Sequence, residues 1–418
     1  MMTRALRLTH YVFLIFLAGC SSLAPLLASR TPTAAPVPQV TPTPQATATA
    51  TVVPETEPPI LRVWVPSQFN PSAGTGAADL LNRRLEQFEA ENPGLQIEVR
   101  VKAEDGEQDL LNSLSITNGA APAAMPDLIA LSRSDLETAV SRGLLHPIDG
   151  LSTALLDPDW YGYARGLGQI QDTAYGLPFA GQTLVLVYRP GFRAIDNWND
   201  LLENEAPVVF AADDPQGMIG LSLYASAGGD ILDAQGLPTL DPEVLTRVLD
   251  VVQEGLSRNV FLSSMANISA DSQTLQVYRS GESDRAIIWT LDYSPSLDGL
   301  LLPLPGLNET PYSFATGWVW ALAGSNPENQ QLAVKLAEHL VAGDFIAQWT
   351  SGTDYLPTRP SSIGEGDETI AAILESAEPI PPNNVVVVLG PLMQEALTRV
   401  LKGEKPDVVA GSVVEKLR

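Results

Sequence analysis

From residue 60 onwards, short β-branched or aromatic runs alternate with stretches that have helical spacing of apolar residues. Residues 61–65 form the first run, and a helical pattern follows over residues 77–91. Two further runs, residues 97–101 and residues 127–131, are each preceded by such a stretch. Strands and helices in this order are typical of a parallel sheet with right-handed crossovers. The sequence therefore predicts an α/β lobe at the start of the folded chain.

Local signals mark the ends of the predicted helices. Pro93 and Gly94 stop the first helix, because neither residue favours its continuation. Ser134 is predicted to cap a later helix that Gly143 ends.

The same alternation resumes in the second half of the chain and predicts a second α/β lobe. The strand-like runs are residues 183–188, 208–211, 286–291 and 317–323. The predicted helices open at Asp241-Pro242 and Asn326-Pro327, and the last two lie near residues 391–401 and 407–417. No short repeat of fixed period is present, which disfavours a solenoid or a propeller.

The N-terminus has the features of an export signal. Arg4 and Arg7 precede a short apolar core, which is followed by Leu-Ala-Gly-Cys at residues 17–20. This segment resembles a bacterial lipoprotein signal, in which cleavage precedes the cysteine and its sulfur carries the lipid. The resemblance implies lipidation of Cys20 and anchoring at the outer face of the cell membrane or facing a periplasm. Residues 21–59 are rich in Thr, Pro and Ala, and predict a disordered tether.

Charge and cysteine content exclude several functions. The formal net charge is −25 and no Lys/Arg-rich run is present, so nucleic acid is not an expected partner. One cysteine and three histidines cannot provide an internal disulfide, a Cys-rich zinc site or a four-thiolate iron–sulfur cluster. We expect no metal and no cofactor.

Several short motifs occur in an order that matches a known family. They are FEAENPG (88–94), PDL (126–128), GLLHPI (143–148), YGLPFA (175–180), WNDL (198–201), GGDILD (228–233), LPLPG (302–306) and LPTR (356–359). In this order the chain resembles the extracellular solute-binding proteins of ABC importers, in particular their sugar-binding group. Arg189 departs from the family pattern, which usually has Asn there, and residues 280–286 lack the usual Met.

The resemblance implies a two-lobed, periplasmic-binding-protein-like fold of type II, with the ligand bound between the lobes. Crossings of the chain between lobes are expected near Gln182, near residues 294–302 and near residues 345–351. Residues 60–181 plus 298–345 would then form the N-terminal lobe, and residues 182–297 plus 346–418 the C-terminal lobe. The implied function is capture of a mono- or oligosaccharide by hinge closure and its delivery to the transmembrane subunits of an ABC permease. We expect a monomer.

Candidate binding residues follow from sugar chemistry and from the resemblance. Sugars have apolar C–H faces and rims of hydroxyl groups, so their sites pair aromatic side chains with planar polar ones. Gln182 stands where maltose-binding members have a sugar-contacting Glu, and Asp292 falls near the position of a stacking Trp, which Tyr293 would replace. The full set of candidates is Trp64, Phe69, Gln182, Asp292, Tyr293, Trp318 and Tyr355. A role in the core or on the lobe surface remains the alternative for each.

Two other functions remain open. An exported glycan-degrading enzyme would need paired carboxylates such as Asp213-Asp214 or Asp230 with Asp233, which in so acidic a chain are more typical of turns. His339, near the end of a helix, is not placed as a general base, and no nucleophile elbow or Walker loop follows a strand. A ligand sensor for a membrane receptor would share every feature seen. The sequence favours a binding protein over an enzyme.

Overall fold

The computed structural model describes residues 59–104, 106, 108–192, 195, 197–203, 206–308 and 310–417. The predicted signal, Cys20 and the tether, apart from its last residue, lie outside the described residues. Residues 57–418 form one unit by their contacts.

The main sheet has nine strands, and its central path runs β2-β1-β3-β10-β6-β8-β7. Strand β11 also pairs with β10, and β9 also pairs with β6. The strands are β1 (Ile60–Pro66), β2 (Gln96–Lys102), β3 (Leu128–Ser132), β6 (Gly176–Tyr188), β7 (Val208–Val209), β8 (Arg285–Trp289), β9 (Leu300–Pro303), β10 (Ser313–Leu322) and β11 (Ala377–Pro379). A separate two-stranded sheet joins β4 (Gln169–Ile170) and β5 (Thr173–Ala174).

Strand direction divides the main sheet. Strand β1 pairs in parallel with β2 and β3, which confirms the parallel arrangement predicted for the first lobe. Strand β10 runs antiparallel to both β3 and β6. The sheet is therefore mixed, and β10 joins the parallel strands to the rest.

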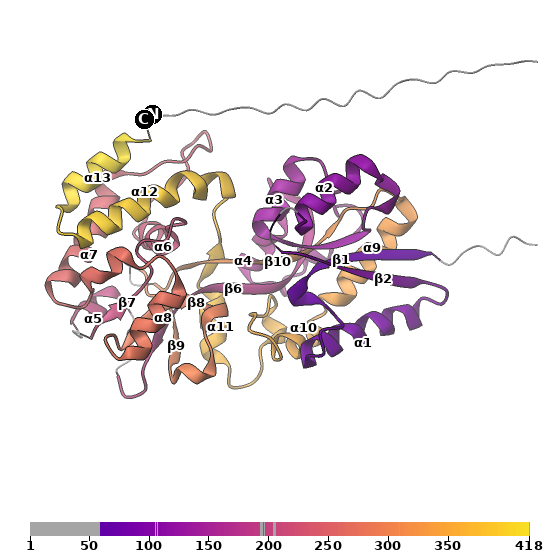
Figure 1. The fold of residues 1–418 in the computed structure, drawn as a ribbon, viewed down its shortest axis with the longest axis horizontal. Helices are drawn as coiled ribbons and strands as arrows, with labels where there is room; N and C mark the ends of the chain where they lie inside the picture. The colour runs from indigo at the N-terminus through magenta and orange to yellow at the C-terminus, as the bar shows by residue number, and fades with distance from the viewer. Residues whose placement is uncertain are drawn as a thin grey trace, which may run out of the picture. The chain divides into compact units, whose positions relative to one another are not determined.

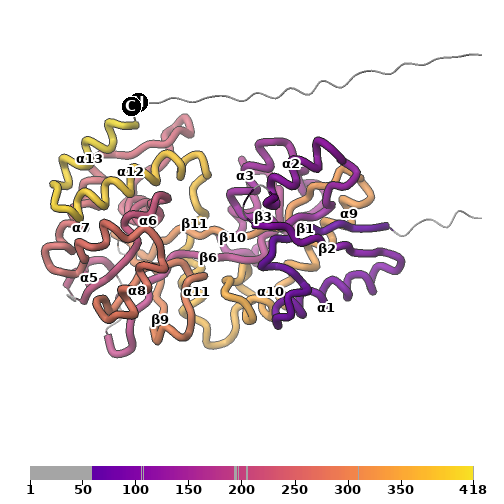
Figure 2. The backbone as a smooth tube through the Cα atoms, viewed as in Figure 1, coloured from indigo at the N-terminus to yellow at the C-terminus, as the bar shows by residue number. Residues whose placement is uncertain are grey.

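Strand β6 is shared by two groups of elements. Its first part pairs with β10 through Thr183, and its last part, Leu184 to Tyr188, pairs with β8. The sequence predicted a strand over residues 183–188 only, so β6 begins seven residues earlier than predicted. The two long strands β6 and β10 run side by side across the middle of the described chain (Figures 1 and 2).

The helices pack in two groups around these strands. They are α1 (Gly76–Glu91), α2 (Leu110–Ala120), α3 (Arg133–Ser141), α4 (Gly162–Leu167), α5 (Trp198–Glu203), α6 (Met218–Ser226), α7 (Pro242–Ser257), α8 (Asp271–Ser280), α9 (Pro327–Leu340), α10 (Gly343–Thr350), α11 (Glu368–Glu375), α12 (Asn383–Leu401) and α13 (Pro406–Glu415). Helices α1, α2, α3, α9 and α10 pack with β1 to β3 and with each other, and we call this group the N-terminal lobe. Helices α6, α7, α12 and α13 pack with each other, and α8 packs with β7 and β8. We call these elements together the C-terminal lobe.

The lobe boundaries given above remain a prediction. Two sets of contacts involve segments close to these boundaries. Residues Leu300–Pro303 pair with the part of β6 that also carries β8, in the C-terminal lobe. Helix α10 packs against α1, in the N-terminal lobe.

Helix α7 illustrates why a sequence pattern gives this structure. The Asp241 carboxylate accepts the backbone N–H groups of Glu243 and Val244 at 2.7 and 3.1 Å, which confirms the predicted cap. Pro242 takes the first helical position, where a missing N–H costs nothing. The buried residues of the helix are Leu245, Val248, Leu249, Val252 and Gly255.

The predicted cap of α3 was wrong by two residues. The residue that caps the helix is Ser132, whose hydroxyl accepts the backbone N–H of Asp135 at 3.2 Å. Ser134 lies inside the first turn, because β3 runs directly into the helix without an intervening loop. Gly143 follows the helix in the left-handed conformation (φ 65°), as predicted for a terminating glycine.

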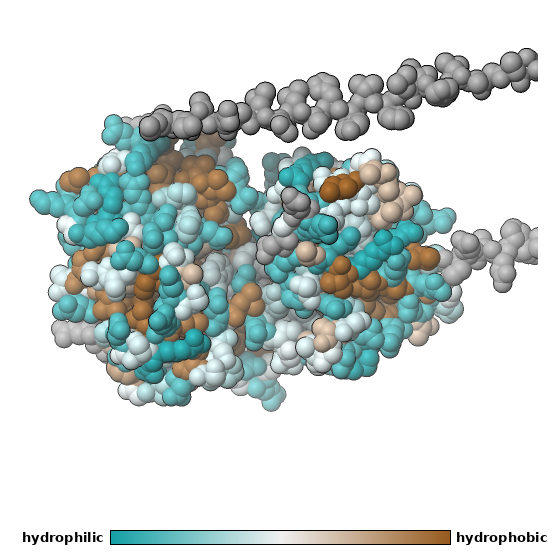
Figure 3. All heavy atoms as spheres, in the orientation of Figure 1, coloured by the Kyte–Doolittle hydropathy of each residue, from teal (hydrophilic) through white to brown (hydrophobic). Residues whose placement is uncertain are grey.

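Helix α12 is the one helix among the described residues that is long and apolar enough to cross a membrane, and just over half of it is buried. It packs against α6, α7 and α13. It starts eight residues before the predicted helix and contains Pro391. Two of its valines, Val387 and Val388, are exposed. Hydrophobic side chains also reach the surface of the C-terminal lobe in Figure 3. Its contacts identify α12 as a core helix of the C-terminal lobe.

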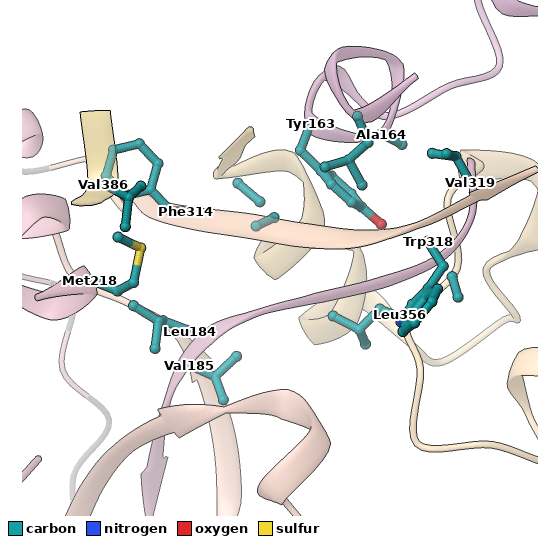
Figure 4. Close-up of a cluster of buried hydrophobic side chains, with 14 of the residues drawn as sticks. Tyr163, Ala164, Leu184, Val185, Met218, Phe314, Trp318, Val319, Leu356 and Val386 are labelled. Carbon is teal, nitrogen blue, oxygen red and sulfur yellow. The ribbon is translucent and has the colours of Figure 1, made fainter. Parts of the chain in front are cut away.

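Close packing around the strand pair β6–β10 requires glycine at two positions. A Cβ at Gly181 would lie 2.3 Å from the Tyr163 hydroxyl oxygen, and a Cβ at Gly317 would lie 2.1 Å from the Ala180 carbonyl oxygen. The Tyr163 side chain points from α4 towards these strands, and its hydroxyl donates to the Pro357 carbonyl at 2.9 Å (Figure 4). Both glycines adjoin positions that line the site described next.

Candidate functional site

A cavity of about 380 Å³ opens between the two lobes, and we call it the central cavity. Gln182, Thr316 and Trp318 line it from the strand pair β6–β10. The N-terminal lobe contributes residues at the start of α3, and the C-terminal lobe contributes residues at the start of α12. The remaining lining residues include Glu104, Ser132, Arg133, Ser134, Glu137, Gln216, Trp289, Leu291, Asp292, Tyr355, Ile380, Asn383 and Val386.

Two smaller cavities share lining residues with the central one. The aromatic cavity, of about 330 Å³, shares Leu291 and Tyr355 and is also lined by Phe69 and Trp349. The acidic cavity, of about 240 Å³, shares Gln216, Trp289 and Asp292. Because the lining is shared, the three cavities adjoin one another, and we call them together the cleft.

Aromatic rings pack along one side of the cleft, which we call the aromatic wall. Phe69 packs edge-on against Trp318, with 5.1 Å between ring centroids, and lies 5.4 Å from the ring of Tyr355. The rings of Tyr355 and Trp349 are stacked at 6.1 Å, with 13° between their planes. Phe69 and Trp318 are 3% and 7% exposed, so their rings belong to the core as well as to the cleft. The wall is a fixed apolar surface.

The Tyr355 hydroxyl stays neutral throughout the physiological range. Burial and, to a smaller extent, the negative charge of Glu104 raise the pKa of Tyr355 to about 12. Side-chain hydrogen bonds with Gln68 and Trp318 act in the opposite direction. A neutral hydroxyl at the edge of an aromatic ring can both donate to and accept from a ligand.

Three carboxyl groups, Asp214, Asp271 and Asp292, line the acidic cavity, and we call this side the acidic wall. Asp271 accepts the backbone N–H of Trp289 at 2.7 Å. Burial, together with the nearby negative charges of Asp292 and Asp214, raises the pKa of Asp271 to about 7 against the opposing effect of the Trp289 N–H. Burial also raises the pKa values of Asp292 and Asp214. A side-chain hydrogen bond also joins Asp271 and Asp292.

The structure brings together five of the seven residues predicted from the sequence. Gln182, Asp292, Trp318 and Tyr355 line the central cavity. Phe69 lines the adjoining aromatic cavity and lies behind Trp318 and Tyr355.

The other two predicted residues lie outside these three cavities. Trp64 is 1% exposed in the core of the N-terminal lobe, with the Lys102 ammonium 4.2 Å from its ring centroid. The Tyr293 hydroxyl donates to the Gly299 carbonyl at 2.9 Å. Their roles as ligand contacts stay predictions.

The sequence did not single out Trp289, which lines both the central and the acidic cavity. The predicted strand extended to Leu291, whereas β8 ends at Trp289 and a 3-10 turn follows over Thr290–Asp292. This turn places Trp289, rather than Tyr293, at the carboxyl end of the strand. An aromatic residue near the end of a predicted strand was the available signal.

Two of the residues considered for catalysis have clear structural roles. The Asp233 carboxylate accepts the N–H groups of Gln235 and Leu237 in a turn, as expected for such a residue. Burial lowers the pKa of His339, followed by the positive charge of Arg84, so this histidine is held neutral at its helix end. Among the residues that the structure describes, no group of three His, Cys, Asp or Glu side chains could hold a metal ion.

Comparison with known proteins gives a family and a fold. Residues 83–372 match the family model of the bacterial extracellular solute-binding proteins. No curated protein matches the chain in sequence. A cyclo/maltodextrin-binding protein complexed with maltotetraose is similar in structure, with a TM-score of 0.70, 20% identity, and coverage of 87% of this chain and 97% of that one.

Two further structures give the same result. A maltose-binding periplasmic protein from Listeria monocytogenes, in complex with maltose, has a TM-score of 0.69, 17% identity, and coverage of 87% of this chain and 97% of that one. A cyclic α-maltosyl-1,6-maltose binding protein from Arthrobacter globiformis has a TM-score of 0.69, 14% identity, and coverage of 86% and 98%. These matches confirm the two-lobed, periplasmic-binding-protein-like α/β fold.

Proposed function

Because the chain belongs to the bacterial extracellular solute-binding proteins, which are exported, we propose that it captures a mono- or oligosaccharide in the cleft between its lobes. The observation that carries this proposal is the lining of the central cavity, which combines Trp318 and Tyr355 of the aromatic wall with Gln182 and with Asp292 of the acidic wall. A sugar ring has apolar C–H faces and a rim of hydroxyl groups, so it can satisfy both walls at once. Closure of the lobes would then exclude water from the bound sugar.

Four side chains are proposed as direct contacts. Trp318 and Tyr355 would pack on the apolar face of a ring, while Gln182 and Asp292 would bind hydroxyl groups. Within the described residues the Gln182 amide has no hydrogen-bond partner, and a primary amide can both donate and accept. Phe69 would hold the aromatic wall in place, and Trp289 would be a second stacking surface.

A thermal-shift screen tests the sugar assignment. The panel contains maltose, maltotetraose and tagatose together with other neutral sugars, and putrescine, spermidine and amino acids serve as the contrasting group. A sugar present at a hundredfold excess over its Kd stabilises the folded state by about 2.7 kcal/mol, which gives a clear rise in Tm. A shift with polyamines or amino acids and none with any sugar would overturn the assignment.

We propose that the protein is a transport component rather than an enzyme. It would deliver the sugar to the transmembrane subunits of an ABC permease, as a monomer. Turnover of an oligosaccharide by the purified protein would favour the rival function, a glycan-degrading enzyme. If cells that lack the gene for this protein no longer take up the sugar, the result supports transport. If they take up the sugar normally but lose a sugar-dependent signal, the result supports a sensor.

We also propose that Cys20 carries a lipid and that residues 21–59 tether the binding unit to the membrane. No other cysteine is present in the sequence, so Cys20→Ala should abolish lipid labelling and leave uncleaved precursor. A mature protein that starts beyond Cys20 and carries no lipid would contradict this proposal.

We further infer that the chain crosses between the lobes within β6, within β10 and again between α10 and α12. The antiparallel pairing of the two long strands, and the packing of α10 on α1, support this assignment.

A further inference from the structure

The carboxylate of Glu137 forms hydrogen bonds on both sides of the cleft. Glu137 lies on α3 of the N-terminal lobe and lines the central cavity. One of its oxygens accepts the guanidinium N–H of Arg133 at 2.8 Å. The other accepts the backbone N–H of Asn383 at 2.7 Å, and Asn383 is the first residue of α12 in the C-terminal lobe. The two oxygens therefore have partners in different lobes.

The Glu137 side chain is held in position from its own lobe. The Arg133 guanidinium donates to the carbonyls of Gly166, Leu167 and Gln169 at 2.8, 3.0 and 2.6 Å. The side chains of Arg133 and Glu137 are only 10% and 16% exposed. A pair so enclosed keeps its geometry better than an exposed i,i+4 pair, and it presents one carboxylate oxygen to the opposite lobe.

The start of α12 has no side-chain cap of its own. Its N-cap residue is Pro382, which makes no capping hydrogen bond. The carboxylate of Glu137 supplies the missing acceptor, and a negative charge at this end of a helix is favoured by the helix dipole. Movement of the lobes apart would deprive this N–H of its acceptor and the carboxylate of its second donor.

We propose that Glu137 is a latch residue that stabilises the closed cleft by binding the first N–H of α12 across it. This inference rests on the proposed function, because a latch on closure raises the affinity for a sugar that the closed cleft surrounds. Glu137 need not contact the sugar to do so.

The first test measures amide hydrogen exchange at Asn383 in the mature, sugar-free protein. Glu137→Gln replaces one of the two acceptor oxygens with an NH2 group, which can only donate. The charged Arg133 guanidinium is the stronger donor and retains the remaining oxygen, so the NH2 group faces the Asn383 N–H, which loses its acceptor. Exchange at Asn383 should become about tenfold faster or more, the change expected for losing a hydrogen bond to a charged group. The matched control is Glu254→Gln, which breaks the i,i+4 pair of Glu254 and Arg258 on α7. Equal exchange in both variants would refute the latch.

The second test removes the donor instead of the acceptor. Asn383→Pro deletes the N–H at the first helical position, where proline is tolerated, and Pro382 already has the extended backbone (φ −51°, ψ 142°) that a following proline requires. Its control is Asn384→Ala at the next, exposed position. Small-angle scattering of the sugar-free protein should give a larger radius of gyration for Asn383→Pro and for Glu137→Gln than for either control. Unchanged radii in both variants would refute the latch.

The two proposals fail in different ways. If no sugar in the thermal-shift panel binds, the proposed function fails, while the exchange and scattering results still decide the latch. If maltotetraose binds, its affinity should fall roughly tenfold in Glu137→Gln and remain unchanged in Glu254→Gln. Equal affinity for maltotetraose in both variants would overturn the latch and leave sugar capture standing.

Discussion

The aromatic wall and the acidic wall line the same cleft but contribute differently to the stability of the fold. The aromatic wall is part of the core, since Phe69 contacts the rings of Phe179, Trp318, Trp349 and Tyr355 at centroid distances of 5.0 to 5.7 Å. The acidic wall instead places Asp271 against Asp292, where burial and like charge disfavour ionisation. One wall therefore serves the fold and the site together, whereas the other holds carboxyl groups whose ionisation the fold disfavours.

The largest expected effect tests the structural role of the aromatic wall. Phe69→Ala should lower the free energy of unfolding by about 3–5 kcal/mol, because it removes a buried ring and leaves a cavity among four others. Chemical denaturation measures the change, and Phe69→Leu, which retains most of the apolar volume, should cost much less. Asp292→Asn on the acidic wall should cost nothing or stabilise the fold. A loss for Asp292→Asn as large as for Phe69→Ala would break the comparison.

The second prediction concerns Gln182, which lies between the walls on the shared strand β6. Gln182→Ala should weaken sugar binding five- to 150-fold, about 1–3 kcal/mol, because sugar hydroxyls in the closed cleft would lose their partner. Titration calorimetry measures this with the best sugar of the panel. The Tm of the sugar-free protein should change little, since the amide has no partner among the described residues. Unchanged affinity would place Gln182 outside the site, and a large fall in Tm would make its role structural.

The third prediction sharpens the acidic side of the comparison through pH. The folded-state pKa of Asp271 is about 7, well above its ordinary value of 3.8. Between about pH 4 and pH 7 the folded state therefore holds a proton that the unfolded chain releases, so the free energy of unfolding should fall as the pH rises through this window. The expected size is on the order of 1–2 kcal/mol, because solvent screens this partly exposed pair.

Denaturation at pH 4.5 and pH 7.5 checks this sign. Asp271→Asn can still accept the Trp289 N–H and should remove most of the difference between the two pH values. Asp250→Asn, at an exposed position of α7, serves as the control and should leave the difference in place. If the free energy of unfolding instead rises between pH 4.5 and pH 7.5, and rises equally in the wild type and in Asp271→Asn, the pKa of Asp271 is not raised.

Most of the fold could be predicted because its signals are local. The cap at Asp241, the proline after it and the buried stripe of α7 are all set by residues within one helix. The order of the motifs then predicted the two-lobed arrangement. It also predicted Gln182 and Trp318 as candidate binding residues, and both line the central cavity. These features depend on residue types at fixed spacings, which a sequence displays directly.

The remainder depends on contacts between distant segments. The bond between Glu137 and Asn383 joins residues 246 positions apart, so no local pattern contains it. Trp289 was missed because a 3-10 turn ended the strand two residues earlier than its apolar run. Trp64 has an aromatic side chain of the kind that stacks on sugars, but the packing of β1 between β2 and β3 buries it.

The smallest expected effect separates fold from site within the first turn of α3. Ser132 and Ser134 both line the central cavity, but only Ser132 accepts the N–H of Asp135 and also donates to its carboxylate, at 2.9 Å. Ser132→Ala should therefore lower the free energy of unfolding by about 1 kcal/mol, the usual cost of losing a cap. Ser134→Ala should change it by less than about 0.5 kcal/mol, as expected at a site without such a contact. Denaturation of the two variants in parallel measures the difference. The two hydroxyl oxygens lie 3.1 Å apart. If both substitutions lower the free energy of unfolding equally, either hydroxyl can cap the helix, and the first turn of α3 would not separate a residue that stabilises the fold from one that only lines the cavity.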